Sequence, residues 1–304
     1  ENNGIIEEAK TNASLNWGNK IATARWNWLI NPKLFSNVTA ISSRYRFLTD
    51  VGLEESETQL GTTTTQSFQL SYLSQIEDMG IKWDFDYRPS PNHSIKFGSG
   101  LTRHQFEPGV NSIVMNLGGA GTLDTSFGSF PQTAMDYVAY VQDDWKLGDR
   151  LRINMGLHLN GFNVGESNYL SLQPRLSARY LLNEKSSIKW SYVEMTQYMH
   201  LLANQTIGLP TDLWVPVTEN ILPQEAWQTA IGYAYNFGEG WELTLEGYYK
   251  DMQNLIEYKD GASFLFGFDD WQEKVTSGRG WAYGTELLLE KRRGRTTGWL
   301  GYTW

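Results

Sequence analysis

The residues that could carry out catalysis or hold a metal ion are few in this sequence and lie far apart. His93, His104, His158 and His200 are its only histidines, and their spacing matches no metal-binding motif such as His-Glu-x-x-His. The chain contains no Cys, which removes disulfides, thiolate metal sites and thiol nucleophiles. We therefore expect no metal site and no bound cofactor.

Two adjacent carboxylate pairs are the best remaining candidates for acid–base chemistry. Asp143 and Asp144 fall in a predicted strand, where neighbouring side chains point to opposite faces and do not act together. Asp269 and Asp270 fall in a predicted loop, where solvation explains them better than calcium binding. No Gly-x-Ser-x-Gly motif occurs, and the glycine-rich stretch 118–121 precedes no predicted helix. We expect no catalytic residue and no enzymatic activity.

The composition indicates a β protein. The 304 residues include 13 Trp, 16 Tyr and 13 Phe, whereas charged residues make up only 19%. This combination fits neither a disordered chain nor a coiled coil. No run of about 18 apolar residues is present that could cross a bilayer as a helix. The net charge of −9 argues against nucleic acid as a partner, because phosphate binding needs a basic surface.

The elements that must position these side chains are strands, because apolar and polar residues alternate along most of the chain. Such alternation sends apolar side chains to one face of a strand and polar side chains to the other. Between 151 and 159 every odd position is apolar, and most even positions are polar. The same pattern recurs at 81–88, 172–182 and 227–246.

Short and long connections alternate between these strands. Six tight turns are predicted at 31–33, 89–92, 147–149, 183–185, 238–240 and 293–295. The intervening connections span 48–78, 106–133, 163–167, 199–221 and 258–279, and four of the five exceed ordinary hairpin length. We therefore predict about twelve antiparallel strands in one unit over 1–304, with the long loops on one rim. No stretch reads as a linker between two domains.

Strand length distinguishes two β architectures. Strands of a water-soluble sandwich average about 5–6 residues, whereas the predicted strands run to about 10–14. That length suits a tilted membrane crossing, and short turns on one rim with long loops on the other are typical of outer-membrane barrels. We predict an all-β, antiparallel transmembrane β-barrel, whole or partial. The alternative is a soluble or surface β-protein that binds glycans through loop aromatics.

A barrel in lipid determines which face is polar, because charged residues facing the hydrocarbon are costly. The polar positions of the alternating strands are therefore expected to line the lumen, where they pair with one another or form a hydrophilic substrate path. They are Arg152, Asn154, His158, Asn160, Arg175, Arg179, Glu242, Glu246 and Glu286.

Exposed aromatics in two long loops are candidates for contact with a substrate or a partner. Trp214 lies in the loop 199–221, and Phe264, Phe266, Phe268 and Trp271 lie in the loop 258–279. Aromatic faces suit sugar rings or an apolar protein surface. The alternative is that these loops pack on themselves. The extracellular rim is expected to bring both loops to the same opening.

Several sequence motifs resemble those of one protein family. The stretch 140–157 resembles a "YxQDxWk…LtlnlGLR" hairpin, and 171–180 resembles the strand that follows it. The stretches 223–233 and 245–256 resemble a "P-E…GyeY" and "yYKkmknLI" pair, and 280–287 is similar to "G-aYGlEl". These are motifs of TonB-dependent outer-membrane receptors, and their style is closest to receptors of Bacteroidetes, which include the SusC-like glycan importers.

The resemblance implies a nutrient importer of the Gram-negative outer membrane, in contact with membrane lipid. Its substrate would be a glycan, siderophore, cobalamin or peptide. Such receptors have a plug domain, which contacts the TonB system, and a barrel of twenty-two strands. Neither a plug nor a signal peptide is recognised in 1–304, so we expect a barrel fragment. A SusD-like surface lipoprotein is the partner that the SusC resemblance implies.

Overall fold

The computed structural model describes residues 6–129, 131–202, 213–260, 262 and 270–304. Almost all of them lie in antiparallel strands, as the alternation predicts. The strands are β1 (Ile6–Asn31), β2 (Leu34–Gln59), β3 (Thr62–Ser90), β4 (His93–Asn116), β5 (Thr122–Gly128), β6 (Gln132–Leu147), β7 (Leu151–Val164), β8 (Ser167–Asn183), β9 (Ser186–Gln197), β10 (Met199–Leu202), β11 (Leu213–Pro216), β12 (Gln224–Gly238), β13 (Trp241–Tyr258), β14 (Val275–Lys291) and β15 (Gly298–Thr303). Two short 3₁₀ turns, Gly118–Ala120 and Trp271–Lys274, complete the described elements.

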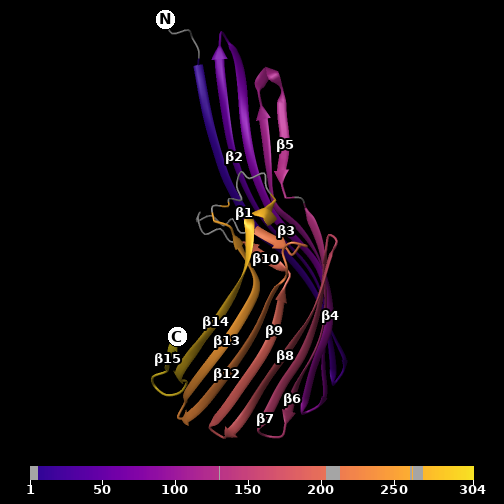
Figure 1. Ribbon diagram of the computed structural model, residues 1–304, viewed down its shortest axis with the longest axis vertical. Helices are drawn as coiled ribbons and strands as arrows, with labels where there is room; N and C mark the ends of the chain where they lie inside the picture. The colour runs from indigo at the N-terminus through magenta and orange to yellow at the C-terminus, as the bar shows by residue number, and fades with distance from the viewer. Residues whose placement is uncertain (1–5, 130, 203–212, 261, 263–269) are drawn as a thin grey trace.

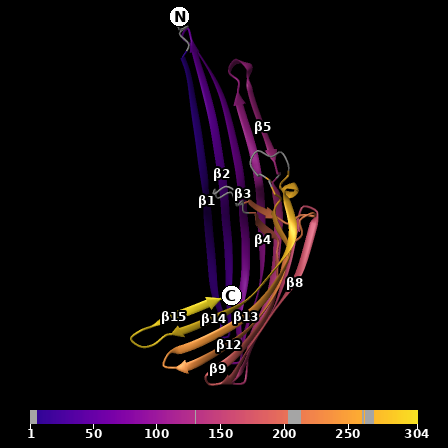
Figure 2. The same cartoon turned by 60° about the vertical axis from the view of Figure 1, so that its left-hand side comes forward.

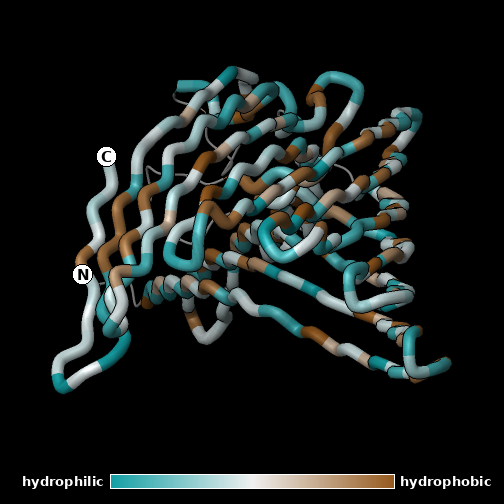
Figure 3. Tube along the Cα trace, turned by 90° about the horizontal axis from the view of Figure 1, so that it is seen from below, coloured by the Kyte–Doolittle hydropathy of each residue, from teal (hydrophilic) through white to brown (hydrophobic). Residues whose placement is uncertain are grey.

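Twelve of these strands follow one another in a single antiparallel sheet, which confirms the predicted fold class. The order is β1-β2-β3-β4-β6-β7-β8-β9-β12-β13-β14-β15, and β5 adds to β4 beyond the point where β6 ends. Within the described chain β1 pairs only with β2, and β15 pairs only with β14, so these two strands are the edges of the sheet. Figure 3 shows the strands from below, following one another around an arc.

All six predicted turns are present and lie at the same end of the sheet; five of them are two or three residues long, and the sixth is a longer connection over 292–297. Local hydrogen bonds explain several of them. The Asn31 side chain accepts from the Lys33 amide, Asn183 accepts from the Lys185 amide and Asn236 accepts from the Gly238 amide. Asn side chains that bond to the backbone two residues on are typical of turns.

The prediction of a long loop over 48–78 is wrong. The segment is a hairpin, because β2 and β3 run on past the other strands and meet at the two-residue turn Leu60–Gly61. Both turn residues have positive φ, 52° and 80°, as a tight hairpin turn requires. The connection over 106–133 is likewise mostly strand, since β4 and β5 form a second extended hairpin. Figures 1 and 2 show both hairpins rising well above the rest of the sheet.

The connection between β9 and β12 folds back over one face of the sheet. Its described part contains the β10–β11 hairpin, in which His200 lies opposite Val215. β11 packs against β3 and β4, whereas β10 packs against β13, a strand far away in the sheet order. The hairpin therefore bridges the arc at the end opposite the tight turns. We call the sheet face that it covers the inner face.

No helix in the described part of the chain is long and apolar enough to cross a membrane.

Candidate functional site

The strand register places all nine predicted lumen residues on the inner face. Residues that pair across adjacent strands share a face, and a single row runs from Arg152 through Arg179, Lys189 and Gly232 to Glu246. The same alternation carries the other members, which are Asn154, His158, Asn160, Arg175, Glu242 and Glu286. That they line a substrate path remains a prediction.

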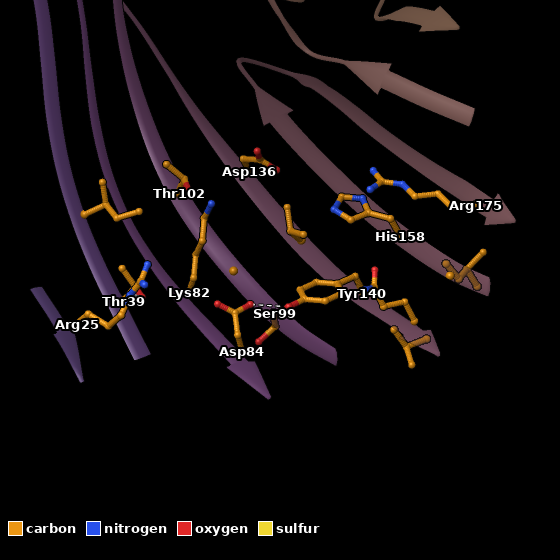
Figure 4. Close-up of a pocket in the computed structure, with 17 residues that line it drawn as sticks. Arg25, Thr39, Lys82, Asp84, Ser99, Thr102, Asp136, Tyr140, His158 and Arg175 are labelled. Carbon is orange, nitrogen blue, oxygen red and sulfur yellow. Dashed lines mark hydrogen bonds between the residues drawn. The ribbon is translucent and has the colours of Figure 1, made fainter. Parts of the chain in front are cut away.

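A hollow of about 560 Å³ lies on this face where β1 to β4 meet β6 to β8. Figure 4 shows side chains from all these strands turned toward it. Tyr140 donates a hydrogen bond to Asp84 Oδ1 at 2.7 Å, and Arg25 donates to Thr39 at 3.1 Å. Lys82 has no carboxylate within ion-pair distance among the described residues. The hollow therefore offers hydrogen-bonding groups of both kinds and charges of both signs, since Asp84 and Asp136 line it together with Arg25, Lys82 and Arg175.

A second hollow of about 290 Å³ lies nearer the tight turns. Arg152 bonds there to the Asp144 carboxylate through two nitrogens, its Nε at 2.6 Å from Oδ1. Arg179, Lys189 and Glu246 line the same hollow. Glu242 lies at the end of this face, 3.0 Å from Arg292 in the last turn. Of the predicted lumen charges, Arg152 and Glu242 thus meet partners, and the inner face carries both signs.

The adjacent carboxylates Asp143 and Asp144 point to opposite faces, as predicted. Asp144 binds Arg152 on the inner face, whereas Asp143 Oδ2 lies 2.6 Å from His93 Nδ1 on the outer face. Asp270 caps a 3₁₀ turn by accepting from the Gln272 amide at 2.9 Å, and Asp269 lies outside the described residues.

A buried polar cluster that sequence reasoning missed lies directly beneath the β10–β11 hairpin. His104 Nδ1 is 2.7 Å from Asp78, which also accepts from the Ser43 hydroxyl at 3.0 Å. Asp136 accepts from the Asn160 amide and lies 4.0 Å from His104 Nε2. The cluster draws on five strands, and its members are separated along the chain by up to 117 positions, from 43 to 160. Only the register reveals it.

This cluster does not resemble a metal centre. Over the residues that the structure describes, no three His, Cys, Asp or Glu side chains are grouped closely enough to hold a metal ion. His158 and His93 lie on opposite faces, and His200 lies in the bridging hairpin.

Above the cluster, the connections β9–β12 and β13–β14 pack together into what we call the lid, comprising the described residues of 198–223 and 259–274. Thr218 Oγ1 donates to Gln272 at 2.6 Å and joins the two connections. The Tyr169 hydroxyl of β8 donates to the Thr218 carbonyl at 2.6 Å, and the Trp271 amide donates to Ser129 at 3.3 Å. Hydrogen bonds thus tie the lid to strand β8 and to the connection between β5 and β6.

The expectation that the lid aromatics are exposed is wrong for Trp271. Its side chain is 2% exposed, in an apolar cluster with Leu202, Leu213, Val215, Ile221 and Val275. Trp214 is half-buried against a neighbouring cluster that contains Phe106 and Phe162. Phe264, Phe266 and Phe268 lie outside the described residues. Trp271 is shielded from water because the two connections pack against each other around this shared apolar cluster.

Burial also changes the acid–base behaviour of this end of the molecule. It lowers the pKa of His200 to about 4, and neither ring nitrogen has a hydrogen-bond partner in the described part of the chain. On β3, burial raises the pKa of Tyr72 above its usual range, and Tyr258 and Tyr45 add to the effect. His200 is therefore neutral at physiological pH.

The outer face of the sheet is apolar and open. Trp26, Trp83, Ile231 and Trp281 are between 49% and 67% exposed there. Other large apolar residues of the same face are Trp28, Ile81, Leu101, Tyr137, Met155, Leu157, Leu159, Leu172, Leu176, Tyr180, Trp190, Tyr233, Leu245, Tyr249 and Tyr283. Water-soluble monomers rarely expose so large a continuous apolar surface, whereas a barrel wall presents one to lipid.

Comparison with known proteins decides the family. Residues 3–304 match the family described as TonB dependent receptor-like, beta-barrel. The chain belongs to this family. TonB-dependent receptors reside in the outer membrane of Gram-negative bacteria and are transporters rather than enzymes, so the chain is part of an outer-membrane barrel wall. None of the curated proteins matches it.

Solved structures share the fold at low sequence identity. The FrpB iron transporter from Neisseria meningitidis has a TM-score of 0.56 at 12% identity, over 94% of this chain and 53% of that protein. The siderophore receptor PirA from Pseudomonas aeruginosa has a TM-score of 0.53 at 14% identity, over 98% and 60%. The ferric yersiniabactin receptor FyuA from Yersinia pestis has a TM-score of 0.51 at 11% identity, over 100% and 57%. The chain thus spans somewhat more than half the length of these receptors.

Proposed function

We propose that the chain forms the translocation wall and extracellular lid of a TonB-dependent nutrient importer. The observation that carries this proposal is the opposite polarity of the two faces of one sheet. The outer face is apolar from Trp26 to Tyr283, while the inner face carries Lys82, Arg152 and Glu246 beneath an ordered lid. A wall of this kind suits passage of a hydrophilic solute across lipid.

The substrate class is left open among a siderophore, a cobalamin, a glycan and a peptide. Similar structures include an iron transporter, siderophore receptors and a copper transporter. The hollow lined by Arg25, Lys82, Arg175 and His158 also carries the carboxylates Asp84 and Asp136. Such a surface suits a polar substrate with both hydrogen-bond donors and acceptors, which all four classes carry.

The partners belong to the proposal as well. Energy would come from the TonB system through a plug domain in the full-length receptor. The resemblance of 140–304 to Bacteroidetes motifs supports a SusC-like importer with a SusD-like lipoprotein partner. Trp214 and the cluster around Trp271 would act at the extracellular opening, either by contacting the incoming solute or by holding the lid closed over it.

The rival function, a soluble or surface β-protein that binds glycans through loop aromatics, leaves the outer face unexplained. The apolar belt would need a cover in water. One of the loop aromatics that this rival depends on, Trp271, is buried rather than presented to a sugar ring.

Uptake measurements test the proposed function. Cells carrying the full-length receptor should accumulate one of a labelled ferric siderophore, cobalamin, maltooligosaccharide or oligopeptide, and deletion of TonB should abolish that accumulation. Uptake of a substrate at the same rate without TonB would contradict the proposal. Trp214→Ala combined with Trp271→Ala should weaken uptake while the receptor still folds into the outer membrane. Unchanged uptake in this double variant would mean that Trp214 and Trp271 only pack the loops and take no part in uptake.

A further inference from the structure

The strands β1 to β4 reverse their polarity along their length. In the lower part the apolar side chains, such as Trp26 and Trp83, point outward, and the charged ones point inward. Beyond the row that joins Phe47 and its neighbours the inner face becomes apolar. Residues 6–16, 48–73 and 110–128 form this upper region, which we call the blade.

Two rows of paired residues carry the apolar side chains of the inner face of the blade. The first row joins Leu53, Phe68, Met115 and Leu123, and the second joins Val51, Leu70 and Ile113. Leu53 and Leu123 are 47% and 50% exposed. Below these rows, Phe47 and Tyr72 are buried.

A bulge in β4 keeps the apolar side chains of its upper part, such as Ile113 and Met115, on the inner face. Residues 107 and 110 of β4 pair with residues 75 and 73 of β3, so β4 gains one residue over its neighbour. The inward positions therefore change from even numbers, such as Phe106, to odd numbers, such as Ile113 and Met115. Gly109 allows the bulge, since its φ is 87° and a Cβ there would lie 2.8 Å from the Tyr72 hydroxyl.

The outer face of the blade is polar and internally bonded. Asp50 accepts from the Ser71 hydroxyl at 2.6 Å and from the Ser14 hydroxyl at 3.4 Å. Ser56 and Thr65 lie 3.2 Å apart on the same face. Water is therefore the natural environment of the outer face, which means that the blade stands above the lipid.

The inner face of the blade has no cover at its upper end within the described chain. The lid reaches only its lower end, through the packing of β11 on β3 and β4. A sheet with one polar and one apolar face normally buries the apolar face. Leu53 and Leu123 thus leave a docking surface beside the mouth of the barrel.

Charge indicates the kind of partner. Three of the seven carboxylates of the blade, Glu7, Glu55 and Glu57, lie on its inner face, and no cation of the blade lies there. The other four, Glu8, Asp50, Glu54 and Asp124, lie on the outer face with the single cation, Lys10. Glu55 and Glu57 follow Leu53 on the same inner face, and both are exposed. A flat sheet face offers a small molecule no concave pocket, whereas an apolar centre with a charged border is typical of protein interfaces.

We propose that the inner face of the blade docks an extracellular protein whose apolar patch is bordered by Lys and Arg. The inference rests on the proposed function in one respect, because it requires that the blade lie outside the membrane. Opposite charges at the border would steer the encounter, and Leu53 and Leu123 would be buried at its centre.

Peptide binding to the full-length receptor in nanodiscs tests this surface. The probes are two extended peptides, one alternating Leu with Lys and one alternating Leu with Glu, and empty nanodiscs give the background. The Leu–Lys peptide should bind at least tenfold more tightly than the Leu–Glu peptide. L53N combined with L123N should weaken binding of the Leu–Lys peptide at least tenfold. E55Q combined with E57Q should weaken it severalfold and flatten its salt dependence.

Val114→Asn is the matched control, because Val114 lies at the same height on the outer face and is also an apolar residue. It should leave peptide binding unchanged. An equal loss in this control, or equal binding of both peptides, would overturn the inference. A receptor dimer that L53N with L123N dissociates would also overturn it, because a second copy would then be the occupant.

The two proposals fail separately. If uptake proves independent of TonB, the importer proposal fails, and the peptide-binding result still stands. If the receptor sediments with the outer membrane and takes up its substrate but does not distinguish the two peptides, only the docking proposal fails.

Discussion

His200 shows how a single side chain couples the lid to pH. It is 1% exposed on β10, and burial lowers its pKa to about 4 from the ordinary 6.5. The neutral ring is therefore the form that the folded lid accepts. Protonation requires the ring to reach water, and that requires β10 to leave the apolar cluster around Trp271.

We predict that the lid loosens in acid. The stabilisation is fully present above pH 6.5, where both the folded and the opened lid hold a neutral ring, and it is lost as the pH falls from about 6.5 to 4. At pH 5 the lid should be less stable by about 2 kcal/mol than at neutral pH. A spin label on a cysteine introduced at Leu201, which is 43% exposed, should gain mobility over this range.

His200→Phe supplies the control for this measurement, since it keeps a ring of similar size and removes the charge. The label in that variant should be equally immobile at pH 7.5 and pH 5. Mobility that rises equally with and without His200 would assign the pH response to other groups.

The face on which a side chain lies can be predicted from the sequence, whereas its contacts across strands cannot. The assignment of Arg152, His158 and Glu246 to one face follows from period-two alternation alone, because a strand fixes it. The contact of His104 with Asp78 and Asp136 depends on which residue of one strand meets which residue of the next. No local pattern encodes that register over such long strands.

At the scale of elements, the strands meet two different environments. Lipid surrounds the lower part of β1 to β4, and water surrounds the blade, so the polarity of both faces reverses near Phe106. The segment 48–78 alternates only around 51–53 and 68–72, and its many Thr and Glu residues are typical of loops. Exposure to water, not loss of strand structure, explains that composition. The six turns are predictable because Asn, Gly and Pro act locally.

Trp271 should hold the lid together. Its removal from a cluster that includes Leu213 and Val215 leaves a large cavity, so Trp271→Ala should destabilise the lid by about 3–5 kcal/mol. Hydrogen exchange of the β11 amides in the full-length receptor, followed by mass spectrometry, should accelerate accordingly.

Trp281→Ala is the comparison variant, because Trp281 is 67% exposed on the outer face and touches no lid cluster in the described chain. Lid exchange should be unaffected by it. If Trp271→Ala leaves lid exchange at the native rate, the lid does not depend on this cluster.

At the scale of the whole molecule, the sheet separates an apolar outer face from a polar inner face. Adjacent residues of β7 allow a stringent comparison: Leu157 is on the outer face and His158 on the inner. Leu157→Arg should cost about 2–4 kcal/mol of folding free energy, because it puts a charge into hydrocarbon near mid-membrane. His158→Arg should cost far less, since it adds a charge to a hydrated polar surface.

Urea titrations of the full-length receptor folding into phospholipid vesicles give both values. Equal destabilisation by the two substitutions would remove the distinction between faces. A larger cost for His158→Arg would reverse their assignment.

The central claim is that one face of this sheet meets lipid and the other meets water, and a nitroxide scan of β7 tests it most directly. Single labels at each position from 153 to 160, in the full-length receptor in vesicles, would be challenged with oxygen, which partitions into lipid, and with a water-soluble nickel chelate. Oxygen collisions are expected at Ile153, Met155, Leu157 and Leu159, and nickel collisions at the even positions between them. Nickel reaching both sets equally would contradict the central claim.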